Sequence, residues 1–266
     1  MRLKAGGIMK MKLEENLRDS YEYTIKLFKS VGRLVALIIL NIIPIVNFIV
    51  TGYFAKVIKE SPGSTDPPRL EKYGELWIDG AKIFVVTIVY MMVPIILIAI
   101  GAASMTIAGI FIPMIGLGIM GSILMVAGII LAFIITIIAI MAIAHMVKVG
   151  KLGSAFDFNA ILSKIKAVGW GNYILWIIIL FAISLVLSGI SFIPYIGWII
   201  TLIISPIFMV FIGRSAANVY ESAAIISTPQ LAIAQPNLFC GYCGNPLKPD
   251  DKFCGKCGRP VKQETS

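Results

Sequence analysis

The sequence predicts an all-α multi-pass membrane helix bundle followed by a small cysteine-containing module at the C-terminus. Two observations predict this fold class. Of the 266 residues, 58% are hydrophobic and only 14% are charged, which lies outside the composition of soluble domains. All four cysteines fall between residues 240 and 257, downstream of the apolar part of the chain.

Three long stretches contain no Lys, Arg, Asp or Glu: Leu34–Ala55, Ile83–Val147 and Ala167–Gly213. A membrane-spanning helix needs only about 20 apolar residues, and a soluble core would still need polar helix faces. We therefore expect about five or six membrane-embedded helical segments. The predicted domains are a multi-pass membrane domain (11–221), a linker (222–238) and a C-terminal domain (239–262).

Residues 11–30 place apolar side chains on one helical face, with Arg18, Lys26 and Lys29 elsewhere. The face consists of Leu13, Leu17, Tyr21, Ile25 and Phe28. This spacing is typical of a helix on the membrane surface, and equally of an ordinary helix packed against the bundle.

The first uncharged stretch carries Asn41, Pro44 and Asn47 near its middle. It is either one kinked span or a hairpin that enters and leaves the same face. Irregular backbone at that depth must be covered by protein or water. We expect the two asparagines to cap a break around Pro44, although residues of this kind also line transport paths.

The second stretch is too long for one span and breaks within residues 101–121, before a long helix through Ile123–His145. Two or three crossings both fit. Gly118 with Ser122, and Gly128 with Ala132, provide small faces for close helix packing. His145 is the only histidine, and an interfacial position is a better interpretation than a ligand or proton-relay role.

A short amphipathic helix should begin after Asp157, whose carboxylate can cap it. Its apolar stripe consists of Phe158, Ile161, Leu162, Ile165 and Val168. The third stretch then divides into two spans joined by "SFIPYI", which predicts an antiparallel hairpin turning at Pro194.

Charge gives the orientation. The segment up to residue 33 has eight Lys/Arg, and cytoplasmic segments of membrane proteins are enriched in these residues. We therefore expect a cell-membrane protein with both termini cytoplasmic. The 56–82 segment has five Lys/Arg and five acids, so its side is weakly specified. Six crossings with it outside are slightly preferred over four crossings plus a re-entrant 34–55 hairpin with it inside.

Several phrases of the chain resemble an uncharacterised family of prokaryotic multi-pass membrane proteins, known only as a domain of unknown function. They are "NFIVTGYFAKVIKE", "GELWIDGAKIF", "VGKLGSAFDFNAI" and "SFIPYIGW". The likeness covers roughly residues 15–220. It implies an all-helical membrane domain and brings no catalytic residues with it.

The cysteines form two copies of Cys-x-x-Cys-Gly, at Cys240/Cys243 and Cys254/Cys257. Two such knuckles supply four thiolates, a tetrahedral shell suited to one structural Zn²⁺ per chain. The glycine after each second cysteine tolerates a left-handed backbone. A 23-residue segment cannot bury enough apolar surface to fold alone, and metal binding closes that gap. The two knuckles are therefore predicted to fold together around one zinc ion.

Two disulfides are the main alternative in an oxidising compartment, and an iron–sulfur cluster or rubredoxin-like iron fits the same thiolates. Residues 239–261 also resemble the short zinc ribbons at the ends of prokaryotic membrane proteins. The formal charge of residues 239–262 is +3, from five basic and two acidic residues. We expect the ribbon to contact a protein partner and not nucleic acid.

The sequence carries little sign of catalysis. "GLGIMG" matches a dinucleotide-binding glycine pattern but lacks the strand and the acidic residue that such a site needs. The apolar stretches hold no acid pair and no Ser/His set, so we expect no enzyme. Beyond the lipid bilayer, the remaining classes are a membrane scaffold or regulatory protein with an interaction module, and a passive transporter or channel with a regulatory ribbon. The oligomeric state stays open.

Overall fold

The computed structural model describes residues 13–110, 115–227, 238–239, 242–243, 246–247 and 253–260. The chain divides into two compact units, a helical membrane domain up to Ile226 and a C-terminal unit from Ser227. The last helix of the membrane domain continues to Ser227, so the start of the expected 222–238 linker is helical.

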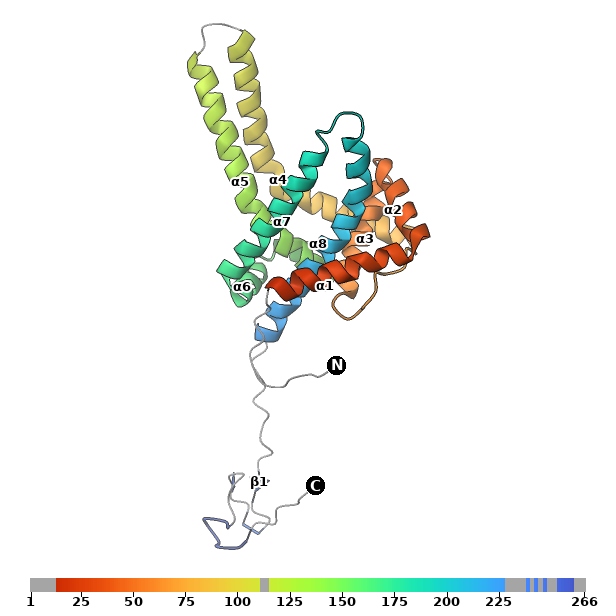
Figure 1. Ribbon diagram of the computed structural model, residues 1–266. Helices are drawn as coiled ribbons and strands as arrows, with labels where there is room; N and C mark the ends of the chain where they lie inside the picture. Colours follow the sequence, from red (N-terminus) through yellow and green to blue (C-terminus); the bar gives the residue numbers. More distant parts are fainter. Residues whose placement is uncertain are drawn as a thin grey trace. The chain divides into compact units, whose positions relative to one another are not determined.

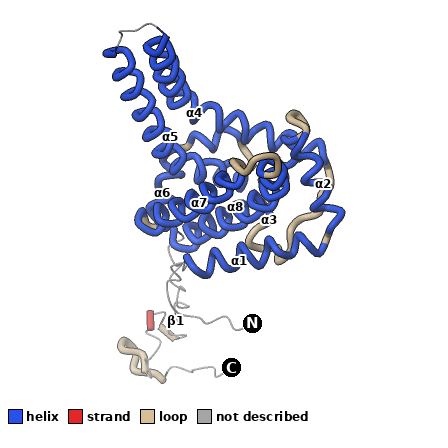
Figure 2. The backbone as a smooth tube through the Cα atoms, turned by 45° about the horizontal axis from the view of Figure 1, so that its top comes forward, coloured by secondary structure: helices blue, strands red, loops and turns tan. Residues whose placement is uncertain are grey.

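The membrane domain consists of helices of very different length (Figures 1 and 2). They are α1 (Leu13–Ile25), α2 (Val31–Ile42), α3 (Asn47–Glu60), α4 (Tyr73–Ile110), α5 (Ile115–Val149), α6 (Phe158–Val168), α7 (Trp170–Ile190) and α8 (Gly197–Ser227), with 3₁₀ turns η1 (Lys26–Lys29) and η2 (Leu152–Phe156). Within the described residues, α4, α5, α7 and α8 are the four helices long and apolar enough to cross a membrane. The predicted all-α membrane fold is confirmed.

The first uncharged stretch forms a short helical hairpin. With 12 and 14 residues, α2 and α3 are about 18 and 21 Å long, too short for a hydrocarbon core of about 30 Å. The loop that follows α3 receives hydrogen bonds from Arg33 at the start of α2, so both outer ends of the hairpin lie together. With four helices long enough to span, the arrangement fits four crossings plus a hairpin better than the six crossings that were slightly preferred.

The break between α2 and α3 is stabilised by the two asparagines. The side-chain amide of Asn47 donates to the side-chain oxygen of Asn41. It also donates to the backbone carbonyl of Asn41 at 3.1 Å. The Asn41 amide in turn donates to Ser205 Oγ of α8 at 2.7 Å. These bonds satisfy part of the interrupted backbone and tie the hairpin to α8, which confirms the expected capping role.

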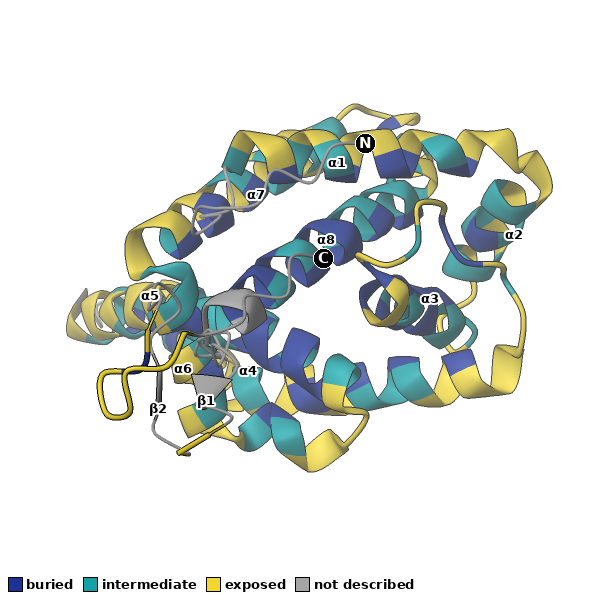
Figure 3. Cartoon of the chain, turned by 90° about the horizontal axis from the view of Figure 1, so that it is seen from below, coloured by how far each residue is buried: buried dark blue, intermediate teal, exposed yellow. Residues whose placement is uncertain are grey.

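The charged segments gather at one end of the domain, called here the charged end. It comprises α1, the loop after α3, the end of α5 with η2 and α6, and the end of α8. Lys148 of α5 pairs with Glu221 of α8 at 2.7 Å and also donates to the carbonyl of Ser61. Figure 3 looks onto this end: α8 lies in the middle with many buried residues, and α1 and α3 lie on either side of it.

Glycines allow two very close helix contacts along α4. A Cβ on Gly52 of α3 would lie 1.7 Å from the carbonyl oxygen of Leu76, and one on Gly80 would lie 1.9 Å from that of Phe48. Toward the other end of α4, a Cβ on Gly128 would lie 2.7 Å from Ile98. Gly128 therefore has its expected packing role.

Two helical hairpins complete the domain. α7 and α8 are joined by the turn around Pro194, as predicted. The second uncharged stretch crosses twice, as α4 and α5. Pro94 lies inside α4, where it removes a backbone donor and favours a bend. Both views show α4 changing direction before its second half rises beside α5 (Figures 1 and 2).

The helix α1 packs with its polar face inward. Asn16, Ser20 and Thr24 are buried, whereas Tyr21 and Phe28 of the apolar face are 61% and 51% exposed. In water this arrangement would be unfavourable, because the apolar face would be solvated. It is typical of a helix lying in the membrane interface, so of the two interpretations of residues 11–30 the structure favours the membrane-surface one.

Candidate metal centre and the polar contacts of the membrane domain

Three of the four predicted metal ligands come together. The Sγ atoms of Cys243, Cys254 and Cys257 all lie within 4.8 Å of one another. The distance between the sulfurs of Cys243 and Cys254 is 3.5 Å. Four sulfurs bound tetrahedrally at about 2.3 Å from a zinc ion would be about 3.8 Å apart, so this spacing fits a metal centre. Cys240, the fourth predicted ligand, lies outside the described residues.

The second knuckle has the local geometry that the sequence predicts. The amide of Gly258 donates to the carbonyl of Cys254 at 2.8 Å, and the amide of Cys254 donates to the carbonyl of Arg259 at 2.8 Å. Gly258 follows Cys257 and has φ +68°, the left-handed conformation that glycine adopts without strain. The chain thus turns tightly enough to point Cys254 and Cys257 at one position.

The electrostatics of the knuckle favour a thiolate. Backbone amides of Cys257 and Lys256 donate to the sulfur of Cys254 and lower the pKa of its thiol. The thiolate is the form of cysteine that binds metals. Together with the sulfur spacing, this gives the cluster the donor chemistry that a metal ion requires.

The ribbon also carries exposed aromatic side chains. Tyr242 is 76% exposed, and the guanidinium of Arg259 lies 3.5 Å from the centroid of its ring. Phe253 is also exposed, at 63%. Its backbone pairs with that of Pro260, while β1 (Leu238–Phe239) pairs antiparallel with β2 (Pro246–Leu247).

A buried polar network joins α1, α7 and α8 at the charged end. Asn16 donates to Ser215 Oγ at 2.8 Å, and the indole of Trp176 donates to the same oxygen at 2.8 Å. Asn218 donates to Asn16 Oδ1 at 3.0 Å and to Asp19 Oδ2 at 2.8 Å. Each of these polar groups is satisfied by another, which lowers the cost of burying it.

The centre of this network is an ion pair. Arg214 Nε donates to Asp19 Oδ2 at 2.7 Å, and its Nη1 donates to the carbonyl of Ser64 at 2.8 Å. The Arg214 side chain is only 8% exposed. Burial raises the pKa of Asp19, but the hydrogen bonds from Arg214 and Asn218 outweigh it and leave that pKa below its ordinary value. The pair fixes α1 and the loop after α3 to α8.

His145 takes part in a structural contact. Its Nδ1 lies 2.8 Å from the hydroxyl of Tyr220, and the ammonium of Lys164 lies over the ring of that tyrosine, 4.8 Å from its centroid. The histidine is buried between α5 and α8. His145 thus lies near the end of α5, which agrees with the interfacial position expected from the sequence.

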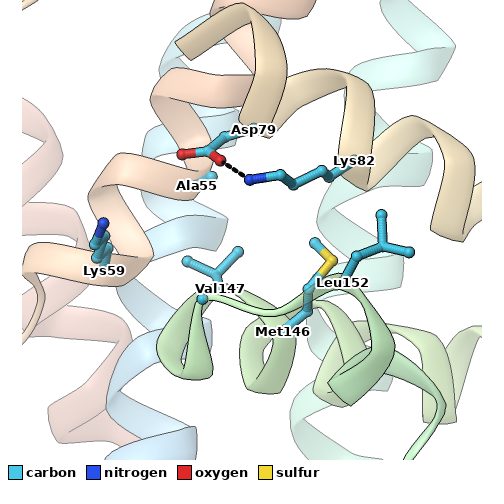
Figure 4. Close-up of a pocket in the computed structure, with 8 residues that line it drawn as sticks. Ala55, Lys59, Asp79, Lys82, Met146, Val147 and Leu152 are labelled. Atoms are coloured by element: carbon cyan, nitrogen blue, oxygen red, sulfur yellow. Dashed lines mark hydrogen bonds and ion pairs between the residues drawn. The ribbon is translucent and has the colours of Figure 1, made fainter. Parts of the chain in front are cut away.

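A small pocket opens at the charged end between α3, α4 and the end of α5 (Figure 4). Its volume is about 110 Å³. Met146, Val147 and Leu152 form an apolar wall, and Asp79 pairs with Lys82 at 2.8 Å on the opposite side. Since the carboxylate and ammonium neutralise each other, the pocket offers no uncompensated charge from this pair.

A second cavity of about 250 Å³ lies between α7 and α8. Hydroxyl groups line it alongside apolar side chains: Ser184, Ser188, Thr201 and Ser205. Ser184 and Thr201 donate to backbone carbonyls of their own helices at 2.8 and 2.9 Å, so their remaining capacity is to accept hydrogen bonds. The cavity contains no charged group.

The sequence interpretation missed the network around Asp19 and Arg214. A signal was present: Asn16, Asp19, Ser20 and Tyr23 recur at helical spacing opposite the apolar face of α1. Arg214 is also the first charged residue after 47 uncharged ones. Polar stripes usually face water, so the sequence alone does not indicate that this one is buried.

Comparison with protein families agrees with both units. Residues 36–196 match the model of a family described as a protein of unknown function (DUF4013). Residues 239–261 match a zinc-ribbon domain. No curated protein and no solved structure matches the chain significantly. The family match covers more than half of the chain, which therefore belongs to the DUF4013 family of proteins of unknown function and carries a C-terminal zinc-ribbon domain.

Proposed function

We propose that this protein is a membrane scaffold or regulatory protein, not an enzyme, whose zinc ribbon binds a protein partner in the cytoplasm. The observation that carries the proposal is the exposed Tyr242–Arg259 pair on the ribbon. Tyrosine and arginine are enriched at protein–protein interfaces. They are also enriched among the few residues of an interface that supply most of its binding energy. A metal-held module has no core of its own to which these side chains would otherwise contribute.

The proposal includes zinc as the metal. Three thiols with the spacing of a tetrahedral site, in a segment that matches a zinc ribbon, support this choice over iron. In this proposal, Cys240, Cys243, Cys254 and Cys257 hold one ion, whose chemistry is structural.

The cytoplasmic orientation is also part of the proposal. α1 and the end of α8 lie at the charged end, and the turn around Pro194 at the opposite end carries no charged residue. An excess of Lys and Arg marks the cytoplasmic side of membrane proteins. We therefore propose that the charged end, both termini and the ribbon face the cytoplasm.

The orientation is tested with single cysteines in a background that has all four native cysteines replaced. Ala5→Cys and Glu264→Cys should resist an impermeant thiol reagent in intact cells, while Phe192→Cys in the opposite turn should react. Labelling of either terminal position in intact cells, at the level seen in lysed cells, would contradict the proposal.

Partner binding is tested by cross-linking in cells and purification of the full chain. Tyr242→Ala should lose the cross-linked partner and keep its zinc, because Tyr242 is not a metal ligand. Lys256→Ala is the matched control: it lies between the two cysteines of the second knuckle and is exposed. Recovery that is unchanged in Tyr242→Ala, or abolished by nuclease, would rule out this protein interface.

A passive transporter or channel is the second candidate, favoured by the hydroxyl-lined cavity between α7 and α8. Neutral hydroxyl groups lower the cost of moving a polar solute through apolar surroundings. The close glycine contacts along α4 favour the scaffold instead. Solute flux in proteoliposomes that falls on Thr201→Val would support the transporter.

A further inference from the structure

The start of α2 forms one wall of a pocket at the charged end of the membrane domain. Its volume is about 480 Å³. Its lining includes Ser30, Gly32 and Arg33 on the α2 side and Arg69 on the facing side. The pocket is distinct from the metal centre, from the pocket of Figure 4 and from the cavity between α7 and α8.

Two guanidinium groups line this pocket: that of Arg33 has no carboxylate partner among the described residues, and that of Arg69 forms a long, exposed ion pair. Arg33 is held by the carbonyls of Pro67 and Pro68, to which its Nη1 donates at 2.8 and 3.0 Å. No carboxylate pairs with it in the described part of the chain, and its buried Nε has no acceptor there. Arg69 is 87% exposed, and its nearest carboxylate, on Glu71, is 3.9 Å away. The pocket is therefore positively charged.

The backbone adds to this charge. The first amide groups of α2 have no acceptors within the helix, and the Ser30 side chain does not cap them. Gly32 leaves open space beside this first turn. A helix start of this kind reinforces an anion site that two arginines already define.

The pocket also lies at the boundary between polar and apolar chain. Arg33 is the last charged residue before the uncharged Leu34–Ala55 stretch. Val31, Val35 and Ile39 are 65%, 45% and 53% exposed and recur at four-residue intervals along α2. This exposed apolar stripe begins at the level of Arg33 and runs along the face of α2 next to Gly32, although Arg33 itself lies on another face of the helix.

We propose that this pocket binds the phosphate headgroup of an anionic phospholipid. Arg33 and Arg69 contact the phosphate oxygens, the hydroxyl of Ser30 donates a further hydrogen bond, and the acyl chains lie along Val35 and Ile39. Basic pockets at the cytoplasmic side of membrane helices bind anionic headgroups in this manner. A water-soluble phosphate shares the headgroup chemistry but would leave the apolar stripe of α2 unused.

The test is titration of the purified full-length protein with phosphatidylglycerol or phosphatidylcholine, followed by native mass spectrometry. The wild type should bind phosphatidylglycerol more tightly than phosphatidylcholine. Arg69→Gln should weaken phosphatidylglycerol binding about fivefold, the effect of one basic residue near an anionic surface.

Arg18→Gln is the matched control, because Arg18 is 71% exposed and lies 4.0 Å from Glu22, much as Arg69 lies near Glu71. It removes the same charge away from the pocket and should leave binding unchanged. Equal affinities in the two variants, or no preference for phosphatidylglycerol in the wild type, would overturn the proposal.

A competition arm distinguishes the two phosphate sources. Bound phosphatidylglycerol should persist when inorganic phosphate is added in large excess, because the acyl chains contribute to binding. Displacement by inorganic phosphate as effective as displacement by added phosphatidylglycerol would mean that the pocket takes a soluble phosphate, and the lipid assignment would be wrong.

Discussion

The membrane domain and the ribbon achieve order by different physical means. The membrane domain has many buried side chains, close glycine contacts and a network in which Arg214 is 8% exposed. In the ribbon, the one cysteine described as buried is Cys254, and its neighbours Phe253 and Tyr242 are exposed. A segment of this size cannot fold on its apolar contacts, so we expect its order to depend on bonds to a metal.

Because of this difference, the membrane domain and the ribbon should lose their folded structure under different treatments. Loss of a metal ligand acts on the ribbon, and loss of a helix contact acts on the membrane domain.

The largest effect is expected from Cys243→Ser. Structural zinc contributes on the order of 10–16 kcal/mol to folding, so the variant should hold close to no zinc and its ribbon should unfold. The melting of the membrane domain in detergent should stay as in the wild type. Elemental analysis and a thermal melt check the two parts, and a membrane domain that melts earlier would show that the units depend on each other.

Asp19→Ala should destabilise the membrane domain by about 2–3 kcal/mol. The substitution leaves the buried Arg214 without its carboxylate partner. The expected loss of stability is smaller than for a fully buried ion pair, because Asp19 is 46% exposed. Glu22→Ala removes an acid from the same helix that is 69% exposed, and should change little. Equal denaturation midpoints for the two variants would refute a stabilising role of the network. Zinc content should be normal in both.

Gly80→Ala should cost roughly 1–3 kcal/mol, because the new methyl group would force α3 and α4 apart. Its position would be 1.9 Å from the carbonyl oxygen of Phe48. Gly74→Ala lies in the same helix with nothing within 4 Å of its Cβ, and should be neutral or slightly stabilising. Thermal melts of the two variants check this. If Gly80→Ala melted at the same temperature as Gly74→Ala, the contact would be wrongly assigned.

The smallest effect is a pH dependence at the same network. Folding holds the pKa of Asp19 below its ordinary value of 3.8. The stability from this shift is therefore fully present above about pH 3.8 and is lost as the pH falls through the lower folded pKa. Asp19→Asn should lose this part of the acid sensitivity. A stability profile between pH 2 and 5 identical to that of the wild type would contradict the assignment.

Local features of this chain were predictable from its sequence. Asp157 caps α6, accepting from the amide of Ala160 at 3.0 Å, and the cysteine spacing anticipated the cluster of sulfurs. These features depend on residues a few positions apart. Long-range features were not predictable in the same way: the Asp19–Arg214 pair joins residues 195 positions apart. The 34–55 stretch is long enough for a span, and the hairpin is distinguished by its broken helix and by long-range contacts such as those of Arg33 with the carbonyls of Pro67 and Pro68.

The two spanning hairpins have different hydrophobic lengths. The 21 residues of α7 rise about 32 Å, close to the hydrocarbon thickness of a bilayer. The 35 residues of α5 rise about 52 Å. One flat bilayer cannot match both hairpins while both stand upright, so α4 and α5 must incline or the surrounding lipid must thicken. The cost of this mismatch depends on the length of the lipid acyl chains, which sets the bilayer thickness. A change in bilayer thickness should therefore change the angle between the two hairpins.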